Sequence, residues 1–199
     1  MRMGRLVVAV TIACWGTLIS VWVLAAMCAR SHARVAGRTD AERVRRIAVA
    51  GAAVIASSLV GAIIASRAAE SSTTDLARWL QAVGLTVLVP STVFAVWARL
   101  TLGSAWSIDP RVPADRVLRM SGPYGVTRHP IYTGILGMVI GSALVIGVPA
   151  AILWAAASIV GVELKIRQEE RLLLTAFPDE YRRYRERVPQ LVPGLRRRR

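Results

Sequence analysis

The sequence has few of the residues on which several classes of fold and site depend. Its 199 residues include only two cysteines and two histidines. Cys14 and Cys28 both fall within or at the edge of one apolar run, so a disulfide scaffold is excluded. Two cysteines and the widely separated His32 and His129 do not make a zinc site, and we expect no metal centre.

Acidic residues are also scarce. Twelve Asp and Glu stand against 26 Lys and Arg, which gives a net charge of +14. Charged residues make up only 19% of the chain, whereas 54% are hydrophobic and the mean hydropathy is +0.47. This apolar content excludes a disordered chain. Because the basic residues flank apolar runs, we expect them to bind anionic membrane headgroups and not nucleic acid, with no obligate protein partner.

Four runs without a charged residue dominate the chain. They span residues 6–27, 47–66, 79–98 and 131–162. Each of the first three is close to the roughly 20 residues that a helix needs to cross a bilayer. The fourth is too long for one span, and Gly147 and Pro149 interrupt it, so we expect a helical hairpin. The sequence therefore predicts an all-α integral membrane protein with about five transmembrane helices and a cytoplasmic C-terminal helical cap.

The distribution of basic residues predicts the orientation. Segments 29–46 and 99–130 and the tail from Lys165 together hold 22 of the 26. Such segments remain cytoplasmic in membrane proteins, so we expect the N-terminus outside and these basic segments on the cytoplasmic side of an inner or plasma membrane. The first run exceeds the about 7–15 apolar residues of a signal peptide, so we expect it to be a retained helix.

The two halves of the chain differ in character. Residues 1–100 form a predicted three-helix transmembrane bundle of plain apolar composition, and residues 101–199 hold the polar residues of specific type and spacing. Gly137 and Gly141 have the spacing that permits close contact between helices. Abundant Ala, Val and Arg beside a single Lys favour a GC-rich, bacterial source.

A turn marked by glycine and proline precedes the fourth run. Pro130 suits the first turn of a helix. We therefore expect Arg128, His129 and Tyr132 to cluster at a helix N-terminus on the membrane face, where free N–H groups favour anions. A juxtamembrane loop with a snorkelling arginine and an interfacial tyrosine is the alternative interpretation.

Two further charged segments follow the fourth run. Residues 163–171 should continue its helix out of the membrane, with Lys165 and Glu169 on one face. A salt-bridged helical exit is the alternative there. Pro178 can begin a last helix, whose first turn holds acidic residues and whose later turns hold basic ones. We expect this helix to be amphipathic and to lie at the membrane interface. The hairpin would bring residues 163–171 beside the turn that precedes it.

These segments, in this order and spacing, resemble the isoprenylcysteine carboxyl methyltransferase and phospholipid methyltransferase family of integral membrane enzymes. The resemblance covers about residues 102–193. Its most specific signature is Gly122-Pro123-Tyr124 followed by Arg128-His129-Pro130-x-Tyr132-x-Gly134. The rest of the pattern consists of Glu169-Glu170, Phe177-Pro178, Tyr181, Tyr184 and Val188-Pro189.

The resemblance implies a methyltransferase that uses S-adenosylmethionine, without a Rossmann sheet, on a lipidic or prenylated acceptor. It implies a cofactor pocket lined by Arg116, Leu118, Arg119, Tyr124, Arg128, His129, Pro130, Ile131, Tyr132 and Glu169. In the stretch 116–119 this chain departs from the His and Leu-Val that the family usually has. The candidate catalytic residues are Lys165, Glu169 and Glu170, with Lys165 where the family can have a basic residue near the acceptor.

The acceptor stays open at this point. The resemblance favours a prenylated cysteine carboxylate, which is already nucleophilic, over an isoprenoid lipid or phosphatidylethanolamine. An amine or alcohol would need a base, for which Glu163, Glu170 and His129 are candidates. Two alternatives lie outside this class: a nicotinamide-dependent relative of the sterol reductases, and a non-catalytic membrane scaffold or lipid-binding protein.

Overall fold

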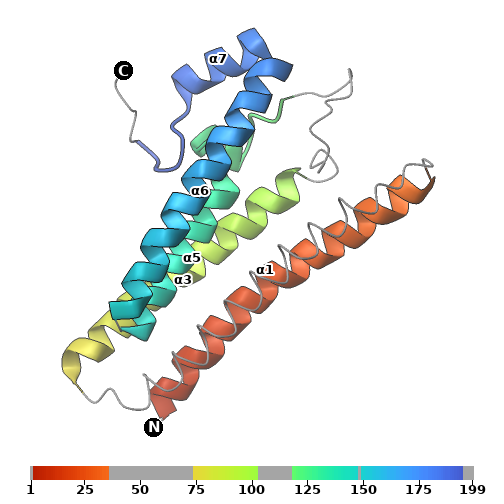
Figure 1. The fold of residues 1–199 in the computed structure, drawn as a ribbon. Helices are drawn as coiled ribbons and strands as arrows, with labels where there is room; N and C mark the ends of the chain where they lie inside the picture. Colours follow the sequence, from red (N-terminus) through yellow and green to blue (C-terminus); the bar gives the residue numbers. More distant parts are fainter. Residues whose placement is uncertain (1, 36–73, 103–117, 148, 195–199) are drawn as a thin grey trace.

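The computed structural model of the chain describes residues 2–35, 74–102, 118–147 and 149–194, and within them it holds helices and no strands (Figure 1). The long helices are α1 (Arg2–Val35), α3 (Asp75–Leu102), α5 (Pro130–Ile146) and α6 (Pro149–Ala176), and the short ones are α4 (Pro123–Val126) and α7 (Pro178–Arg187). The predicted all-α class is confirmed over these residues.

Two helical segments, Gly4–Ala25 and Asp75–Leu102, are long and apolar enough to cross a membrane. Helix α5 is apolar but has 17 residues, and α6 turns from apolar to charged after Val162. The apolar run at 47–66 and the segment 103–117 lie outside the described residues. The count of five membrane helices and the division after residue 100 therefore stay predictions.

The predicted break in the fourth run is confirmed. Helix α5 ends at Ile146, and Gly147 follows in the left-handed conformation with φ of 68°. Its N–H donates to the carbonyl of Ala143 over 3.0 Å, and Pro149 then begins α6. Glycine adopts a positive φ without the steric cost that a side chain brings, so it suits this helix end. Helices α5 and α6 pack side by side as a result (Figure 1).

Small residues let α5 lie directly against α3. A Cβ on Gly134 would lie 2.6 Å from the Cβ of Ala95, and a Cβ on Gly141 would lie 2.7 Å from the carbonyl oxygen of Gly84. Such distances are shorter than carbon contacts allow, so the two backbones approach as closely as they do because these positions are glycine. The close contact predicted for Gly141 thus forms within one chain.

Helix α1 joins this pair through one buried core. The indole N–H of Trp15 donates to the hydroxyl of Ser142 over 3.0 Å, and Leu18 packs near Leu88 and Met138. Aromatic and small residues of α6 pack against the same cluster. This core holds α5 and α6 together. The polar segments lie just before the first residue of α5 and in the C-terminal part of α6.

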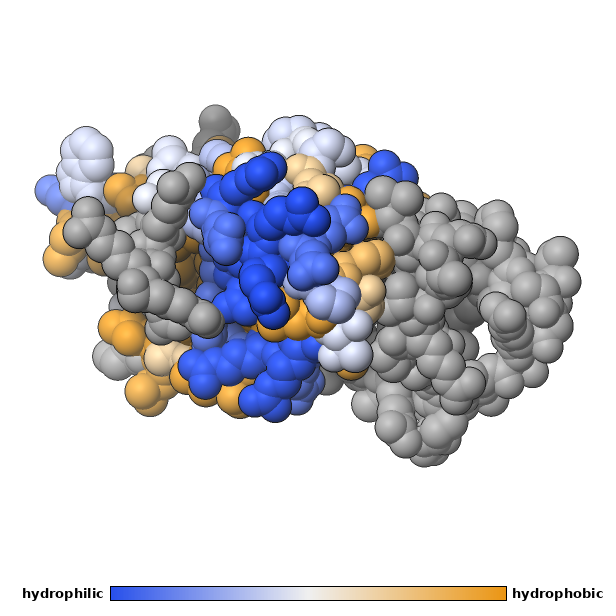
Figure 2. All heavy atoms as spheres, turned by 90° about the horizontal axis from the view of Figure 1, so that it is seen from above, coloured by the Kyte–Doolittle hydropathy of each residue, from blue (hydrophilic) through white to orange (hydrophobic). Residues whose placement is uncertain are grey.

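Helix α7 lies across the far end of α6 (Figure 1). Pro178 occupies its first turn with two acidic residues, and its last turn is basic, as the helix dipole favours. Tyr181 and Tyr184 are buried. The amphipathic helix that we expected at a lipid interface therefore turns its tyrosines toward the protein. Seen from this end, hydrophilic side chains gather on the surface of the molecule (Figure 2).

Candidate functional site

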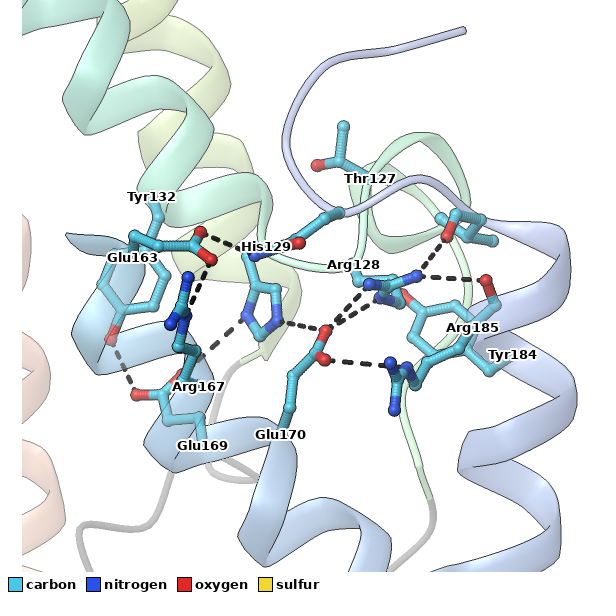
Figure 3. A network of polar contacts seen from close by, with 12 residues as sticks. Thr127, Arg128, His129, Tyr132, Glu163, Arg167, Glu169, Glu170, Tyr184 and Arg185 are labelled. Carbon is cyan, nitrogen blue, oxygen red and sulfur yellow. Dashed lines mark hydrogen bonds and ion pairs between the residues drawn. The ribbon is translucent and has the colours of Figure 1, made fainter. Parts of the chain in front are cut away.

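Three segments that are distant in the sequence meet beside the charged half of α6. They are the loop at 127–129 with the start of α5, the stretch of α6 from 163 to 170, and residues 185–191 (Figure 3). Hydrogen bonds and ion pairs of their side chains and backbone groups form one connected network. Its two neighbouring carboxylates, Glu169 and Glu170, have different surroundings and divide it into a buried part and an open part.

Glu170 is the centre of the buried part. Its Oε1 accepts from Nη2 of Arg128 over 2.9 Å and from Nε of Arg128 over 3.1 Å. Nε of Arg185 lies 3.6 Å from its Oε2. The Arg128 and Glu170 side chains are only 9% and 13% exposed. This buried pair joins the loop before α5, helix α6 and helix α7 at one carboxylate.

These contacts decide the protonation state of Glu170. Burial by itself raises the pKa of its carboxyl, but the hydrogen bond with His129 and the charges of Arg128, His129 and Arg185 lower that pKa to about 2. The carboxyl is therefore ionised at neutral pH. An ionised carboxylate only accepts hydrogen bonds.

The guanidinium of Arg128 has further partners. Its Nη1 donates to the carbonyl oxygens of Arg185 and Val188 over 3.1 and 2.9 Å. Because Nε and Nη2 donate to Glu170, all three nitrogens of the guanidinium donate hydrogen bonds. A lysine ammonium could not reproduce this planar arrangement of donors. The loop before α5 is thereby fastened to the end of α7.

Residues 188–191, here called the C-terminal strap, lie against the start of α5. The backbone N–H groups of Arg128 and His129 and the hydroxyl of Thr133 donate to three successive carbonyls of the strap, over 2.9, 3.2 and 2.8 Å. The N–H groups of Arg128 and His129, which we expected among those that favour an anion, are thus used to hold the strap in place.

Glu169 is the centre of the open part. The hydroxyl of Tyr132 donates to its Oε1 over 2.7 Å, and Nζ of Lys165 lies 4.0 Å from the same oxygen. Its Oε2 lies 3.9 Å from Nδ1 of His129. The Glu169 and Lys165 side chains are 36% and 57% exposed. This carboxylate is therefore reachable from solvent, beside the rings of His129 and Tyr132 (Figure 3).

A second buried contact ties α7 to α4. The hydroxyl of Tyr184 donates to the carbonyl oxygen of Tyr124 over 2.6 Å, and both residues are buried. Burial raises the pKa of both phenols, so the Tyr184 hydroxyl keeps its proton and donates. Together with the contacts of α4 to α3 and α5, this bond holds α4 in place.

Replacing Tyr184 with phenylalanine should lower the free energy of unfolding by about 1–3 kcal/mol, because the buried carbonyl of Tyr124 loses its donor. Chemical denaturation of the detergent-solubilised protein measures the change. Arg182→Met, at an exposed position of α7, is the control and should change little. Equal stability of Tyr184→Phe and the wild type would contradict a structural role for this bond.

The residues singled out in the sequence fall into three groups. Six of them meet in the network: Arg128, His129, Tyr132, Lys165, Glu169 and Glu170. Tyr124, Pro130 and Ile131 are buried on either side of the loop at 127–129, in α4 and at the start of α5. Leu118 and Arg119 precede α4 and take no part in the hydrogen bonds and ion pairs of the described residues, with Arg119 exposed. Arg116 lies outside the described residues.

The sequence analysis missed two participants. Arg185 pairs with Glu170, and Nε2 of Gln190 donates to Oε2 of Glu163 over 3.0 Å. Arg185 stands in an arginine-rich helix, and nothing in its spacing distinguishes it from its neighbours. Its position depends on the turn at Phe177, which folds α7 back over α6.

Comparisons with known proteins agree with this arrangement. Residues 79–180 match the family model of the phospholipid methyltransferases. A protein-S-isoprenylcysteine O-methyltransferase of Tribolium castaneum is 31% identical over 120 residues, which are 59% of this chain and 43% of that protein. Methanethiol S-methyltransferase 1 of Bradyrhizobium diazoefficiens is 38% identical over 73 residues, which are 37% of this chain and 25% of that protein. The chain thus spans less than half the length of these two relatives.

A solved structure has a similar fold. The eukaryotic intramembrane Ras methyltransferase ICMT, an isoprenylcysteine carboxyl methyltransferase, matches with a TM-score of 0.56 and 23% identity, covering 94% of this chain and 68% of that chain. This likeness and the two candidate spans agree on a helical membrane protein. Because the family model covers just over half of the residues, including the loop, the hairpin and both carboxylates of the site, the chain belongs to the phospholipid methyltransferase family.

Proposed function

We propose that this protein is a membrane methyltransferase that moves a methyl group from S-adenosylmethionine to a lipidic acceptor, with O-methylation of an isoprenylcysteine carboxylate favoured. Membership of the family supports the reaction class. The observation that carries the proposal is the bond of 2.7 Å between Tyr132 and Glu169, which joins the two signature segments at a site open to solvent.

The residues of the open part suit S-adenosylmethionine. When bound, this cofactor supplies a methyl group activated by a sulfonium. The Glu169 carboxylate can accept from the cofactor's ribose hydroxyls or its ammonium group. The ring of Tyr132 offers an aromatic face, which attracts cations. Holding the two reactants in line supplies most of the catalysis of such a displacement, up to about 7–11 kcal/mol.

Lys165 is the residue that bears most on the acceptor. Its ammonium is exposed and lies 4.0 Å from Glu169, at the open side of the site. An ammonium there can pair with a carboxylate acceptor, which is nucleophilic without a base. The relative that methylates methanethiol makes a thiol the second acceptor to test.

We propose that this site faces the cytoplasm and that the N-terminus lies outside. The C-terminal part of the chain has an excess of arginine. Segments rich in arginine remain on the cytoplasmic side of membrane proteins. The same basic residues are suited to anionic headgroups of the surrounding membrane.

Calorimetry with S-adenosylmethionine on the detergent-solubilised protein tests the cofactor. We expect binding by the wild type, and a loss of at least about tenfold in affinity for His129→Ala and for Glu169→Ala, because each removes a group of the open part. Glu186→Ala on the exposed face of α7 is the matched carboxylate control and should bind as the wild type does.

Failure of the folded wild type to bind would overturn the proposal in favour of a membrane scaffold. With binding established, transfer of a labelled methyl group to farnesylcysteine, methanethiol or phosphatidylethanolamine identifies the acceptor. Methylation of farnesylcysteine that Lys165→Ala weakens supports the carboxylate assignment. Transfer only to the thiol or the amine would overturn that assignment and leave the cofactor assignment intact.

A further inference from the structure

The C-terminal strap is tied to α6 at two levels. Arg128 donates both to the carbonyl of Val188 and to the carboxylate of Glu170, so the first residue of the strap lies near Glu170. Nε2 of Gln190 donates to Oε2 of Glu163 over 3.0 Å. Positions 163 and 170 share a face of the helix and lie about 10 Å apart along its axis. The strap and the Gln190 side chain together therefore span about two turns of α6.

Gln190 also contacts His129, through its backbone. The N–H of His129 donates to the carbonyl of Gln190 over 3.2 Å, and the His129 side chain is only 5% exposed. One residue is thus bonded to the start of α5 by its main chain and to α6 by its side chain. Because Glu169 stands on α6 as well, this double contact bears on the distance between His129 and Glu169, which is 3.9 Å from Nδ1 to Oε2.

The partner of Gln190 on α6 is itself held in place. Oε1 of Glu163 accepts from Nε of Arg167 over 3.0 Å, one helical turn further on, and Oε2 accepts from Gln190 (Figure 3). A hydrogen bond to a carboxylate is stronger than one between neutral groups. Gln190 is the only residue of the strap with a polar side chain. A side-chain hydrogen bond from the strap to α6 can therefore form only at Gln190.

The hydrogen bonds that join the start of α5 directly to α6 lie at one level. Arg128 bonds to Glu170 and Tyr132 bonds to Glu169, and these two carboxylates are successive residues. A strap that is held at one level can pivot about that level, whereas a second contact about 10 Å away removes this freedom. The backbone of His129 follows the strap, because its N–H is bonded to it.

We propose that Gln190 is a positioning residue, which holds the strap along α6 through Glu163 and so keeps His129 opposite Glu169. A ligand in the open part of the site contacts His129 and Glu169 and not Gln190, so Gln190 acts on binding through its neighbours. The identity of that ligand as S-adenosylmethionine rests on the proposed function.

Gln190→Glu tests the assignment by placing a second carboxyl against Glu163. Repulsion should detach the strap, so hydrogen exchange at the amides of Arg128 and His129, followed by mass spectrometry, should become about tenfold faster. Calorimetry should show an affinity for S-adenosylmethionine lower by about tenfold, the loss of one hydrogen bond. Gln168→Glu makes the same change at an exposed position of α6 and should match the wild type in both measurements.

Exchanging the two partners separates positioning from a general loss of stability. Glu163→Gln combined with Gln190→Glu again pairs one amide with one carboxylate, and should bring exchange and affinity back to within about threefold of the wild type. In Gln190→Met the side chain keeps its length but has no donor. Exchange should become faster and affinity should fall in this variant, and addition of Glu163→Gln should not restore them.

Wild-type exchange and affinity in Gln190→Glu, or no recovery in the exchanged pair, would overturn the proposal. Faster exchange with unchanged affinity would overturn it too, because the strap would then not position the site. Should Gln190→Glu fail to fold, Gln190→Met decides the question by the same two measurements. If the folded wild type does not bind S-adenosylmethionine, the proposed function fails, and amide exchange in the variants alone supports or overturns the hold of Gln190 on His129.

Discussion

Replacing Arg128 with methionine should lower the free energy of unfolding by about 3–5 kcal/mol, the effect of removing one partner of a buried ion pair. The substitution leaves the Glu170 carboxylate buried with its main cation gone. It also removes the donor to the carbonyls of Arg185 and Val188. We therefore expect α7 and the strap to detach from the start of α5 before the membrane helices unfold.

Chemical denaturation in detergent measures this loss, and proteolysis within the strap reports the local detachment. Arg182→Met is the matched control, since Arg182 is exposed on α7. Arg128→Lys should fall between the two, because lysine keeps the charge but cannot form the fork. If Arg128→Met is as stable as Arg182→Met, the buried pair of Arg128 and Glu170 does not hold α7 and the strap against the start of α5.

Acid pH gives an independent check. The pKa of Glu170 in the folded protein is about 2, below its ordinary 4.5. A lowered pKa means that the stabilisation is complete above pH 4.5 and is lost as the pH falls toward 2. The difference in free energy of unfolding between the wild type and Arg128→Met should therefore decrease as the pH falls over the same range. A difference that is constant with pH would point to lost packing instead of lost charge pairing.

Replacing Gly141 with alanine should destabilise the protein by about 1–3 kcal/mol, and leucine at this position should prevent α3 and α5 from packing. The new Cβ would lie 2.7 Å from the carbonyl oxygen of Gly84 and 2.8 Å from the backbone nitrogen of Leu88. These neighbours are backbone atoms, so no side-chain rotation relieves the contact. Gly134→Ala should behave in the same way against Ala95.

Gly161 provides a matched control within the same bundle. Nothing lies within 4 Å of a Cβ at this position of α6. Gly161→Ala should stabilise by up to about 1 kcal/mol, because alanine favours the helix over glycine. Size-exclusion profiles and denaturation of the detergent-solubilised variants measure both effects. Equal responses of Gly141 and Gly161 to alanine would contradict the close approach of α3 and α5.

The local features of this protein were readable from the sequence because each depends on near neighbours. Uncharged runs of membrane length predicted α1 and α3, and the pair Gly147 and Pro149 predicted the break between α5 and α6. Pro178 predicted the start of α7. The signature residues of the family were found by their order and spacing alone, and five of them meet in the network around α6: Arg128, His129, Tyr132, Glu169 and Glu170.

The roles of the two successive carboxylates depended on the folded chain. Glu169 and Glu170 look equivalent in the sequence, but a helix turns successive side chains by about 100°. One of them faces the buried Arg128 and the other faces Tyr132 and solvent. Arg185 and Gln190 could not be found in advance, because their contacts require α7 to fold back at Phe177 and carry the strap to the start of α5. Spacing along the chain determines which groups share a helix, whereas the packing of helices determines which of those groups are buried in pairs and which are left open to a ligand.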